Sequence, residues 1–280
     1  FNLKKKISII ILSFNSEKTI SRSIKSCKKI SKNVFIIDSF SNDSTIKICK
    51  KLKCKIYKHK FKNYSDQRNW AINKFKKISL WQLHLDADDV LDIKAINSIK
   101  KKIKTNSDKA FLIKREEYFL NQKMIYTGKN FWHLRLFKPI NTMCENTLYD
   151  QHFITKDKLG KLDGCIQDNG NENLKQYINK MKRWAKYEAK SHFINKDKNK
   201  IFIFSRLDPR AKTRSFKNTY YQFPRYIRVF IYFIYRYFFK LGFLDGYIGF
   251  LFCFYQGFLF RFMVDIEIGK LINIKNNYKY

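Results

Sequence analysis

The chain of 280 residues is long enough for one large α/β domain with an appendage, or for two modest domains. Its 45% hydrophobic content excludes wholesale disorder. The chain has 58 Lys and Arg residues and 23 Asp and Glu residues, so its net charge is +35. Such a charge favours nucleic acid, anionic lipid or phosphorylated partners and excludes none of the three.

The first hundred residues alternate strand-like and helix-like segments. Short apolar runs predict strands at Ile7–Leu12, Val34–Ile37, Lys55–Tyr57 and Leu80–Leu85. Polar or amphipathic segments between them predict helices at Glu17–Lys29, with Ser16 as N-cap, at Ser44–Lys53 and at Tyr64–Phe75. Such alternation with continuously apolar strands is typical of an α/β fold whose mostly parallel sheet is covered on both faces.

The later chain changes character twice. Residues 111–168 are irregular and strand-rich, with Trp132–Phe137 the clearest strand, and Leu174–Phe193 predicts a helix. Phe223–Val264 is strongly aromatic, with arginines recurring through it, and its longest uncharged run is too short for a spanning helix. We interpret this stretch as helices lying in lipid headgroups; a helical subdomain packed on the catalytic domain is the alternative.

The cysteines and the N-terminal segment bear on the compartment. The six cysteines have no C-x-x-C spacing, so neither a zinc site nor a redox dithiol is expected. We expect them to be reduced thiols in a cytoplasmic protein. The apolar run Ile7–Leu12 is short and lacks a small-residue cleavage site, so it predicts a buried strand and not a signal peptide.

Polar side chains follow three of the predicted strands. Asn15, Asp38 and Asp86 each come just after a strand's C-terminal end. Because ligands of open α/β sheets bind beyond the carboxyl ends of the strands, these residues predict one wall of a binding crevice.

The acidic segment Asp86-Ala87-Asp88-Asp89 is the densest acidic cluster in a very basic chain. A hard divalent cation beside a nucleotide is usually held by one or two carboxylates together with phosphate oxygens. Two carboxylates two residues apart could therefore reach a ribose and a metal together. A solvated acidic turn that caps the next helix is the alternative.

Four segments of the first ninety residues form a set: Ile9–Asn15, Ile37–Thr45, Tyr64–Ala71 and Leu83–Asp88. Together, and in this order, they resemble the motifs of the family 2 glycosyltransferases of the GT-A fold. The resemblance is closest to the bacterial branch that builds lipopolysaccharide cores and surface polysaccharides. The resemblance spans roughly residues 7 to 190. It departs from the family at Phe40, which stands where a glycine is usual and puts the conformation of that loop in question.

The resemblance also implies roles for individual residues. Asp38 would contact the nucleotide base, Asp86 the ribose or base, and Asp88 an Mn²⁺ or Mg²⁺ ion that bridges the diphosphate. Arg68 would face the diphosphate, and Asp66 belongs to the same motif; a surface arginine is the alternative for Arg68, and a turn residue the alternative for Asp38.

Direct displacement at the anomeric carbon, with inversion, requires a general base for the acceptor hydroxyl. Asp150 is the preferred candidate and Glu145 the reserve; both lie in a segment that resembles the family's end-of-domain acidic pair. The expected enzyme moves a hexose from a nucleotide sugar, a UDP-sugar by preference, to a lipid-linked or polysaccharide acceptor. It would be cytoplasmic and peripheral on the inner face of an anionic membrane, with no nucleic-acid partner.

The predicted division of the chain is a catalytic domain at residues 1–200 and a membrane-associating helical region at residues 201–280. A catalytically idle homologue that acts as a scaffold is the alternative function, which the departure at Phe40 leaves open. A nucleic-acid-binding protein fits the charge but not the acidic cluster, which would repel phosphate without a metal.

Overall fold

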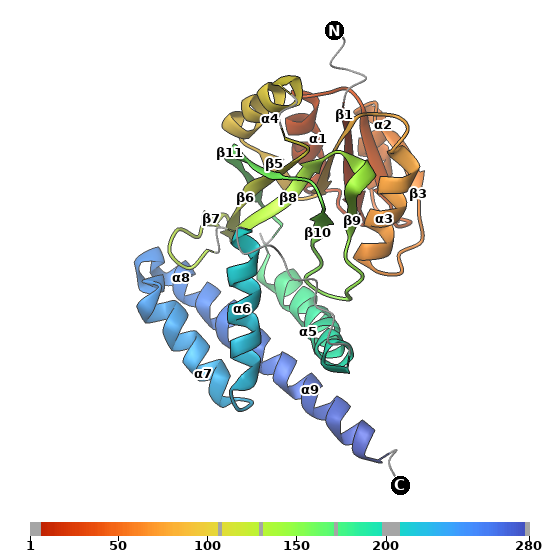
Figure 1. Cartoon of the computed structure of the whole chain (residues 1–280). Helices are drawn as coiled ribbons and strands as arrows, with labels where there is room; N and C mark the ends of the chain where they lie inside the picture. Colours follow the sequence, from red (N-terminus) through yellow and green to blue (C-terminus); the bar gives the residue numbers. More distant parts are fainter. Residues whose placement is uncertain (1–6, 106–107, 129–130, 171–172, 198–207, 278–280) are drawn as a thin grey trace. The chain divides into compact units, whose positions relative to one another are not determined.

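The computed structural model describes residues 7–105, 108–128, 131–170, 173–197 and 208–277 (Figure 1). The chain forms two compact units, each made of segments that are not continuous in sequence. The first unit comprises Phe1–Glu116, Asn130–Asn146 and Gln151–Gly170, and the second comprises Glu117–Lys129, Thr147–Asp150 and Asn171–Tyr280.

One half of the main sheet is parallel. Its strands lie in the order β3-β2-β1-β4, and each adjacent pair is parallel. Their bounds are β1 (Ile7–Ser13), β2 (Val34–Asp38), β3 (Lys55–Lys58) and β4 (Trp81–Asp86). The connecting helices are α1 (Ile20–Lys28), α2 (Thr45–Lys51) and α3 (Tyr64–Phe75). The predicted α/β class is confirmed, and α3 has the predicted bounds.

The other half of the sheet is antiparallel at the pairings β4–β8, β8–β6 and β11–β5. Its strands are β8 (Phe131–Phe137), β6 (Ala110–Phe119), β11 (Leu159–Asp168) and β5 (Asp89–Leu91), with α4 (Ile93–Thr105) following β5. A short strand β7 (Gln122–Lys123) pairs with β6. A 3-10 turn η2 (Pro139–Asn141) leads into a separate two-stranded ribbon of β9 (Thr142–Cys144) and β10 (Phe153–Thr155).

Strand β1 is buried along its whole length because both of its faces are covered. Ile9 and Ile11 pack in one cluster with Ile24 of α1, while Ile10 packs on the other face with Phe75 of α3. Successive side chains of a strand point to opposite faces, so the continuous apolar run of β1 is what a doubly covered strand requires.

The predicted N-cap at Ser16 is wrong, because α1 begins at Ile20 after Thr19. The backbone N–H of Ser16 donates to Thr45 Oγ1 (2.7 Å), and that of Glu17 donates to Asp43 Oδ2 (3.1 Å). These bonds tie residues 16 and 17 to the segment after β2, so they form a turn and do not extend the helix.

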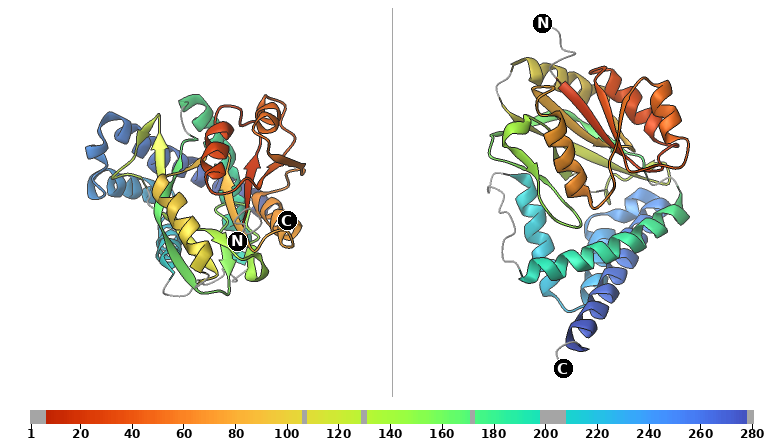
Figure 2. Two further views of the ribbon diagram at one scale, coloured as in Figure 1. Left: turned by 90° about the horizontal axis from the view of Figure 1, so that it is seen from above. Right: turned by 90° about the vertical axis from the view of Figure 1, so that its right-hand side faces the viewer.

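The second unit is largely helical (Figure 2). Its C-terminal part is rich in aromatics, as predicted. Helices α5 (Leu174–Asp197) and α9 (Phe260–Asn277) pack on each other, and Tyr177, Met181, Phe252 and Phe260 belong to their common core. The remaining helical elements are α6 (Pro209–Gln222), α7 (Ile227–Ile234), η3 (Tyr235–Phe239), η4 (Gly242–Asp245), α8 (Gly246–Phe252) and η5 (Cys253–Leu259). Helix α5 thus belongs to the helical unit, although it precedes residue 200, the predicted boundary between the catalytic domain and the helical region.

Two arginines of the aromatic stretch do not face lipid headgroups, contrary to the prediction. Arg228 is buried and forms an ion pair with Asp265, and Arg236 is buried and donates to the carbonyl of Thr127 (2.6 Å). Among the described helices, the continuous stretch Gly242–Asn277 is long and apolar enough to cross a membrane, judged by length and composition.

Candidate functional site

The residues expected at the strand ends share one edge of the sheet. Ser13 of β1 lies opposite Asp38, the last residue of β2, and Leu12 lies opposite Asp86, the last residue of β4. Asn15 follows β1 by two residues. The predicted common edge is therefore confirmed by the register of three neighbouring parallel strands.

Asp38 and Asn15 organise the two loops at this edge. The Asp38 carboxylate is buried and accepts from the Ser41 backbone N–H (2.9 Å), from Ser41 Oγ (2.5 Å) and from Ser13 Oγ (3.3 Å). Asn15 Oδ1 accepts from the Asn42 backbone N–H (3.0 Å). A third link, from Gln67 Nε2 to Ser39 Oγ (2.7 Å), attaches the first turn of α3 to the same loop.

Phe40 occupies the left-handed backbone region, with φ of 63°, and its ring is 55% exposed. That region favours glycine, the residue usual at this position in the resembling family. The loop therefore has at Phe40 a backbone conformation that glycine tolerates better than Phe does. The Lys58 ammonium group lies 5.5 Å from the centre of the Phe40 ring.

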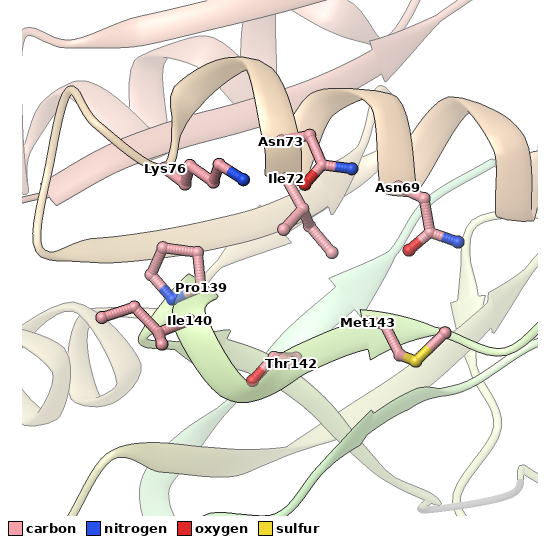
Figure 3. A pocket seen from close by; sticks show the side chains of 8 residues that line it. All are labelled: Asn69, Ile72, Asn73, Lys76, Pro139, Ile140, Thr142 and Met143. Carbon is pink, nitrogen blue, oxygen red and sulfur yellow. The ribbon is translucent and has the colours of Figure 1, made fainter.

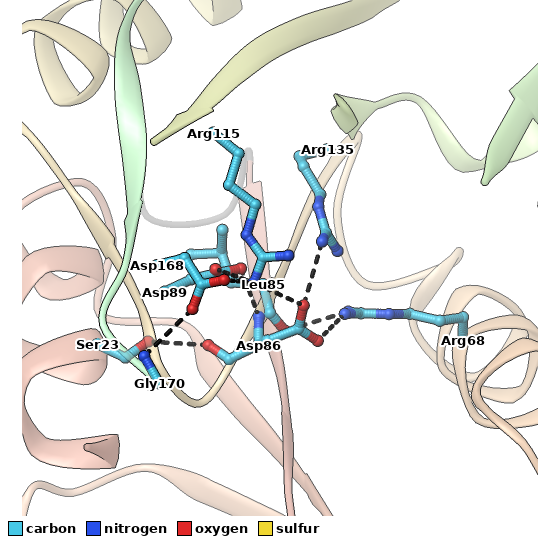
Figure 4. Close-up of polar contacts among 9 residues, drawn as sticks. All are labelled: Ser23, Arg68, Leu85, Asp86, Asp89, Arg115, Arg135, Asp168 and Gly170. Carbon is cyan, nitrogen blue, oxygen red and sulfur yellow. Dashed lines mark hydrogen bonds and ion pairs between the residues drawn. The ribbon is translucent and has the colours of Figure 1, made fainter. Parts of the chain in front are cut away.

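Three arginines converge on Asp86, each from a different element (Figure 4). Arg68 Nη2 of α3 lies 2.5 Å from Asp86 Oδ1, and Arg135 Nη2 of β8 lies 3.1 Å from Asp86 Oδ2. Arg68 is only 3% exposed and its Nη1 also donates to the Leu85 carbonyl (3.1 Å), so it is not a surface arginine. Its position fixes the Asp86 side chain at the end of β4.

The third arginine, Arg115 of β6, bridges several carboxylates. Its Nη2 lies 3.1 Å from Asp89 Oδ1, 3.2 Å from Asp168 Oδ2 and 3.9 Å from Asp86 Oδ2. Asp89 is fully buried, and its Oδ2 accepts from the Asp86 backbone N–H (2.9 Å). The acidic turn is therefore an internally paired structure and not a solvated cap, which excludes the alternative stated for it.

The carboxylates of the acidic turn differ in the direction of their pKa shifts. Burial alone would raise the pKa of Asp86, but the arginines, Arg68 most strongly, outweigh it and hold that pKa well below its usual range. Burial raises the pKa of Asp89, and Arg115, with a smaller contribution from Arg135, offsets this only in part, so the pKa stays above its usual value. Burial, reinforced by Arg68 and Arg135, lowers the pKa of His84 beneath the site well below its usual value, so this histidine is neutral.

Asp88 lies where the backbone of residues 169 and 170 approaches closely. Its carbonyl accepts from the Asn169 N–H (3.3 Å), and a Cβ atom built on Gly170 would stand 1.9 Å from Asp88 Oδ2. Within the described residues no group of three or more His, Cys, Asp or Glu side chains could form a metal cage. A partly exposed carboxylate, against which only a glycine can pack, nevertheless fits a Mn²⁺ or Mg²⁺ ion whose other ligands would be substrate phosphates and water.

The remaining predicted residues lie in other places. Asp66 is in the first turn of α3, where its backbone N–H donates to the Asn63 side chain (2.8 Å) and its Oδ2 lies 3.8 Å from His59 Nε2. Glu145 is buried, and its Oε1 accepts from the His152 N–H (2.7 Å). Asp150 belongs to the second unit, where its Oδ2 accepts from Lys217 Nζ (3.1 Å).

A pocket of about 320 Å³ lies between α3 and the segment from η2 to β9 (Figure 3). Asn69, Ile72 and Lys76 line one side of it, and Pro139 and Met143 the other. None of the predicted site residues lines this pocket, so it does not enlarge the site.

Arg115, Arg135 and Asp168 are site residues that sequence reasoning missed. Arg135 lies within the strand predicted at Trp132–Phe137, between the buried residues Leu134 and Leu136. A charged residue inside an apolar strand was the available signal, since a buried arginine requires an acidic partner. No comparable signal marked Arg115, because it lies in a run of charged residues.

Comparison with known proteins supplies independent information. The family model described as "Glycosyl transferase family 2" matches residues 8–157, which is more than half of the chain. An uncharacterised glycosyltransferase of Rickettsia typhi is 25% identical over 205 residues, covering 66% of this chain and 68% of the relative. One of Rickettsia bellii is 29% identical over 153 residues, covering 54% and 48%.

Solved structures also align with the chain. The Staphylococcus aureus TarS fragment 1–349 in complex with UDP has a TM-score of 0.44 at 15% identity, with 64% of each chain covered. Glucosyl-3-phosphoglycerate synthase from Mycobacterium tuberculosis, in complex with Mn²⁺ and UDP-glucose, has a TM-score of 0.34 at 12% identity, with 41% and 44% covered.

Proposed function

We propose a specific reaction for this chain, which belongs to glycosyl transferase family 2. A hexose moves, with inversion, from a nucleotide sugar to a lipid-linked glycan or to a lipopolysaccharide or exopolysaccharide acceptor. The preference for a UDP-sugar, and the acceptor class, rest on the resemblance of the four motifs to the bacterial polysaccharide branch of the family.

One observation carries the proposal: the polar strand ends share an edge at which Asp88 stands beside Gly170. Asp38 and Asp86 end β2 and β4, the strands on either side of β1, and Asp88 follows Asp86 by two residues. Ligands bind at this edge in open α/β sheets. We assign Asp38, Asn15 and Asp66 to nucleoside binding, Asp86 to the ribose or base, and Asp88 to the metal.

The chain's own residues would prepare the site for a nucleoside diphosphate. Arg68 and Arg135 keep Asp86 ionised and oriented, so that it can accept hydrogen bonds from ribose hydroxyls without moving. Arg68 thus acts through Asp86, in addition to the role at the diphosphate that the family resemblance implies. A bound Mn²⁺ or Mg²⁺ supplies positive charge that neutralises the leaving diphosphate.

The proton of the acceptor hydroxyl passes to a general base, for which Asp150 remains our candidate. Its side chain is about half exposed and therefore accessible, and Lys217 holds one of its oxygens. Glu145, the reserve, already uses its carboxylate to close the loop from residue 145 to residue 152. The difference in accessibility favours Asp150.

We further propose that the enzyme acts at the cytoplasmic face of a membrane, where a lipid-linked acceptor would be presented. The exposed apolar residues of the second unit support this location. They gather between Phe223 and Phe254, in the region predicted to associate with a membrane.

The metal assignment is tested by Asp88→Asn. Losing the carboxylate should lower sugar transfer by about a thousandfold, because the charge on the diphosphate is no longer neutralised. UDP binding, measured by calorimetry with and without Mn²⁺, should lose its metal dependence. Asp163→Asn, an exposed aspartate of β11, is the matched control and should leave both quantities unchanged.

Full activity of Asp88→Asn would refute the metal role. The scaffold alternative makes a different forecast: the unaltered chain would bind neither UDP nor metal, and would show no transfer or hydrolysis of any UDP-sugar. Strong RNA binding that does not depend on metal would also contradict the enzyme proposal.

A further inference from the structure

The charged residues between Tyr226 and Phe260, a range that the structure describes completely, are distributed in an unusual way. Four residues in this range carry a formal charge, and three of them, Arg228, Arg236 and Asp245, are buried. Lys240 is the exposed one. In a protein that faces water on all sides, charged residues lie outside and are almost never fully buried unless paired.

Each of the buried charges has a partner inside the second unit. Arg228 pairs with Asp265 of α9. The Asp245 carboxylate accepts from the backbone N–H groups of Ile125 (3.0 Å) and Thr127 (2.8 Å), as well as from Thr127 Oγ1 (2.8 Å). Arg236 donates to the Thr127 carbonyl. Apart from Arg236 Nη1, which has no hydrogen-bond partner among the described residues, these charged groups bond to protein atoms, as polar groups in hydrocarbon must.

The exposed side of the same helices is apolar. On α7 and η3, residues such as Phe230, Ile234 and Phe238 recur every three or four positions and form one stripe. Tyr247, Phe250 and Phe254 form a second stripe on α8 and η5. The two segments are joined by ring contacts, with 5.0 Å between the centroids of Phe230 and Phe258 and 5.7 Å between those of Tyr237 and Phe250.

We infer that these two stripes form an insertion face, residues 227–254, which enters the hydrocarbon of a lipid bilayer. An interfacial helix of the usual kind displays Lys and Arg along its polar side, but here the arginines point inward and cannot reach headgroup phosphates. Charges inside and apolar rings outside are stable together when the surrounding solvent is apolar. In the stretch Gly242–Asn277, moreover, only 33% of the most apolar 18 residues are buried in the protein, although residues such as Phe252 and Phe260 pack in the core.

The inference deepens the proposed membrane location, on which it rests, and specifies the type of attachment. Attachment by insertion should depend little on lipid charge or on salt, whereas attachment by the chain's many surface lysines would depend strongly on both.

Flotation with vesicles of phosphatidylcholine alone tests this directly. The full chain should float equally well at about 0.1 M and about 1 M NaCl, since screening weakens only electrostatic attraction. The double variant Phe239→Ser/Tyr247→Ser removes two rings that are 75% and 73% exposed and should lower vesicle affinity by about tenfold or more. Ile140→Ser, an 83% exposed apolar residue of the first unit, is the matched control and should float like the parent chain.

A Tyr247→Trp variant adds a measure of depth. Its fluorescence should be quenched by lipids brominated on the acyl chains.

Asp88→Asn should float normally even if it has lost transfer, so failure of the enzymatic proposal and failure of insertion are distinguishable. Binding that requires anionic lipid and disappears at high salt would overturn the inference. So would a soluble dimer that leaves the vesicles unbound, because a second copy of the chain would then cover the face.

Discussion

At the scale of single residues, the loop after β2 holds Phe40 in a backbone conformation that suits glycine better. Phe40 has a positive φ, as does Asn15 in the loop beside it. Asparagine tolerates this region well, whereas a bulky aromatic residue does so at a cost of about 1–2 kcal/mol. The hydrogen bonds of Ser41 to Asp38 hold the loop in shape against that cost.

Comparison of Phe40→Gly with Phe40→Ala isolates this strain, since both variants lose the ring and its contact with Lys58. We expect the glycine variant to be more stable by about 1 kcal/mol, because alanine retains the steric conflict. Urea unfolding of the two variants measures the difference. At Phe216, an exposed position inside α6, the order should reverse, with alanine better by about 1 kcal/mol. Alanine being the more stable variant at both positions would show that Phe40 is unstrained.

At the scale of elements, Arg115 connects strands that are distant in sequence. From β6 it reaches Asp89 at the start of β5 and Asp168 at the end of β11. The acidic turn after β4 therefore depends on a cation from another strand. This arrangement places Asp86 and Asp88 with a precision that their own loop could not provide.

Arg115→Met should destabilise the first unit by about 3–5 kcal/mol, because it leaves the buried Asp89 charge without its cation. Urea unfolding, followed by the fluorescence of the buried Trp81, provides the measurement. Adding Asp89→Asn to the variant should restore part of the loss, since the unpaired charge is then gone. Lys114→Met, the exposed neighbour on β6, should have little effect; an equal loss there would mean that β6, and not the ion pair, is the sensitive feature.

At the scale of the whole molecule, each unit contains its own buried network of charges. In the second unit, Glu188 of α5 accepts from Arg261 of α9 (2.9 Å), lies 3.0 Å from Lys217 of α6, and accepts from the Tyr221 hydroxyl (2.8 Å). Burial alone would raise the pKa of Glu188, but Arg261 and Lys217 outweigh it and lower the pKa from 4.5 to about 2. One carboxylate thus joins three helices.

A depressed pKa in the folded state stabilises the protein above the unfolded pKa and loses that effect as pH falls. We therefore expect the second unit to lose about 3 kcal/mol of unfolding free energy between about pH 5 and about pH 2 through Glu188. Unfolding at a series of pH values, followed by Trp184 fluorescence, should show this loss. Glu188→Gln should flatten that part of the profile, while Glu267→Gln, a carboxylate paired with the exposed Lys270, should not. An unchanged slope in Glu188→Gln would contradict the assignment.

The sequence by itself determined the local elements and their chemistry. Side-chain periodicity, and the strand–helix alternation typical of parallel sheets, predicted several features. These are the apolar run of β1, the bounds of α3 and the positions of Asp38 and Asp86 at strand ends. These features depend on neighbours in the chain, so one sequence is enough to predict them. The four motifs in order also indicated the family.

Only the tertiary structure decided which residues meet across the sheet and which way the arginines point. Arg135 reaches Asp86 from β8, which pairs with β4, and Arg115 reaches it from β6, which pairs with β8; no spacing in the sequence encodes these antiparallel pairings. In the second unit, a pattern of arginines among aromatics fits headgroup contact and internal ion pairs equally well. Which one occurs depends on where Asp265 and Thr127 lie in space, since a buried cation is stable only when its partner is buried with it.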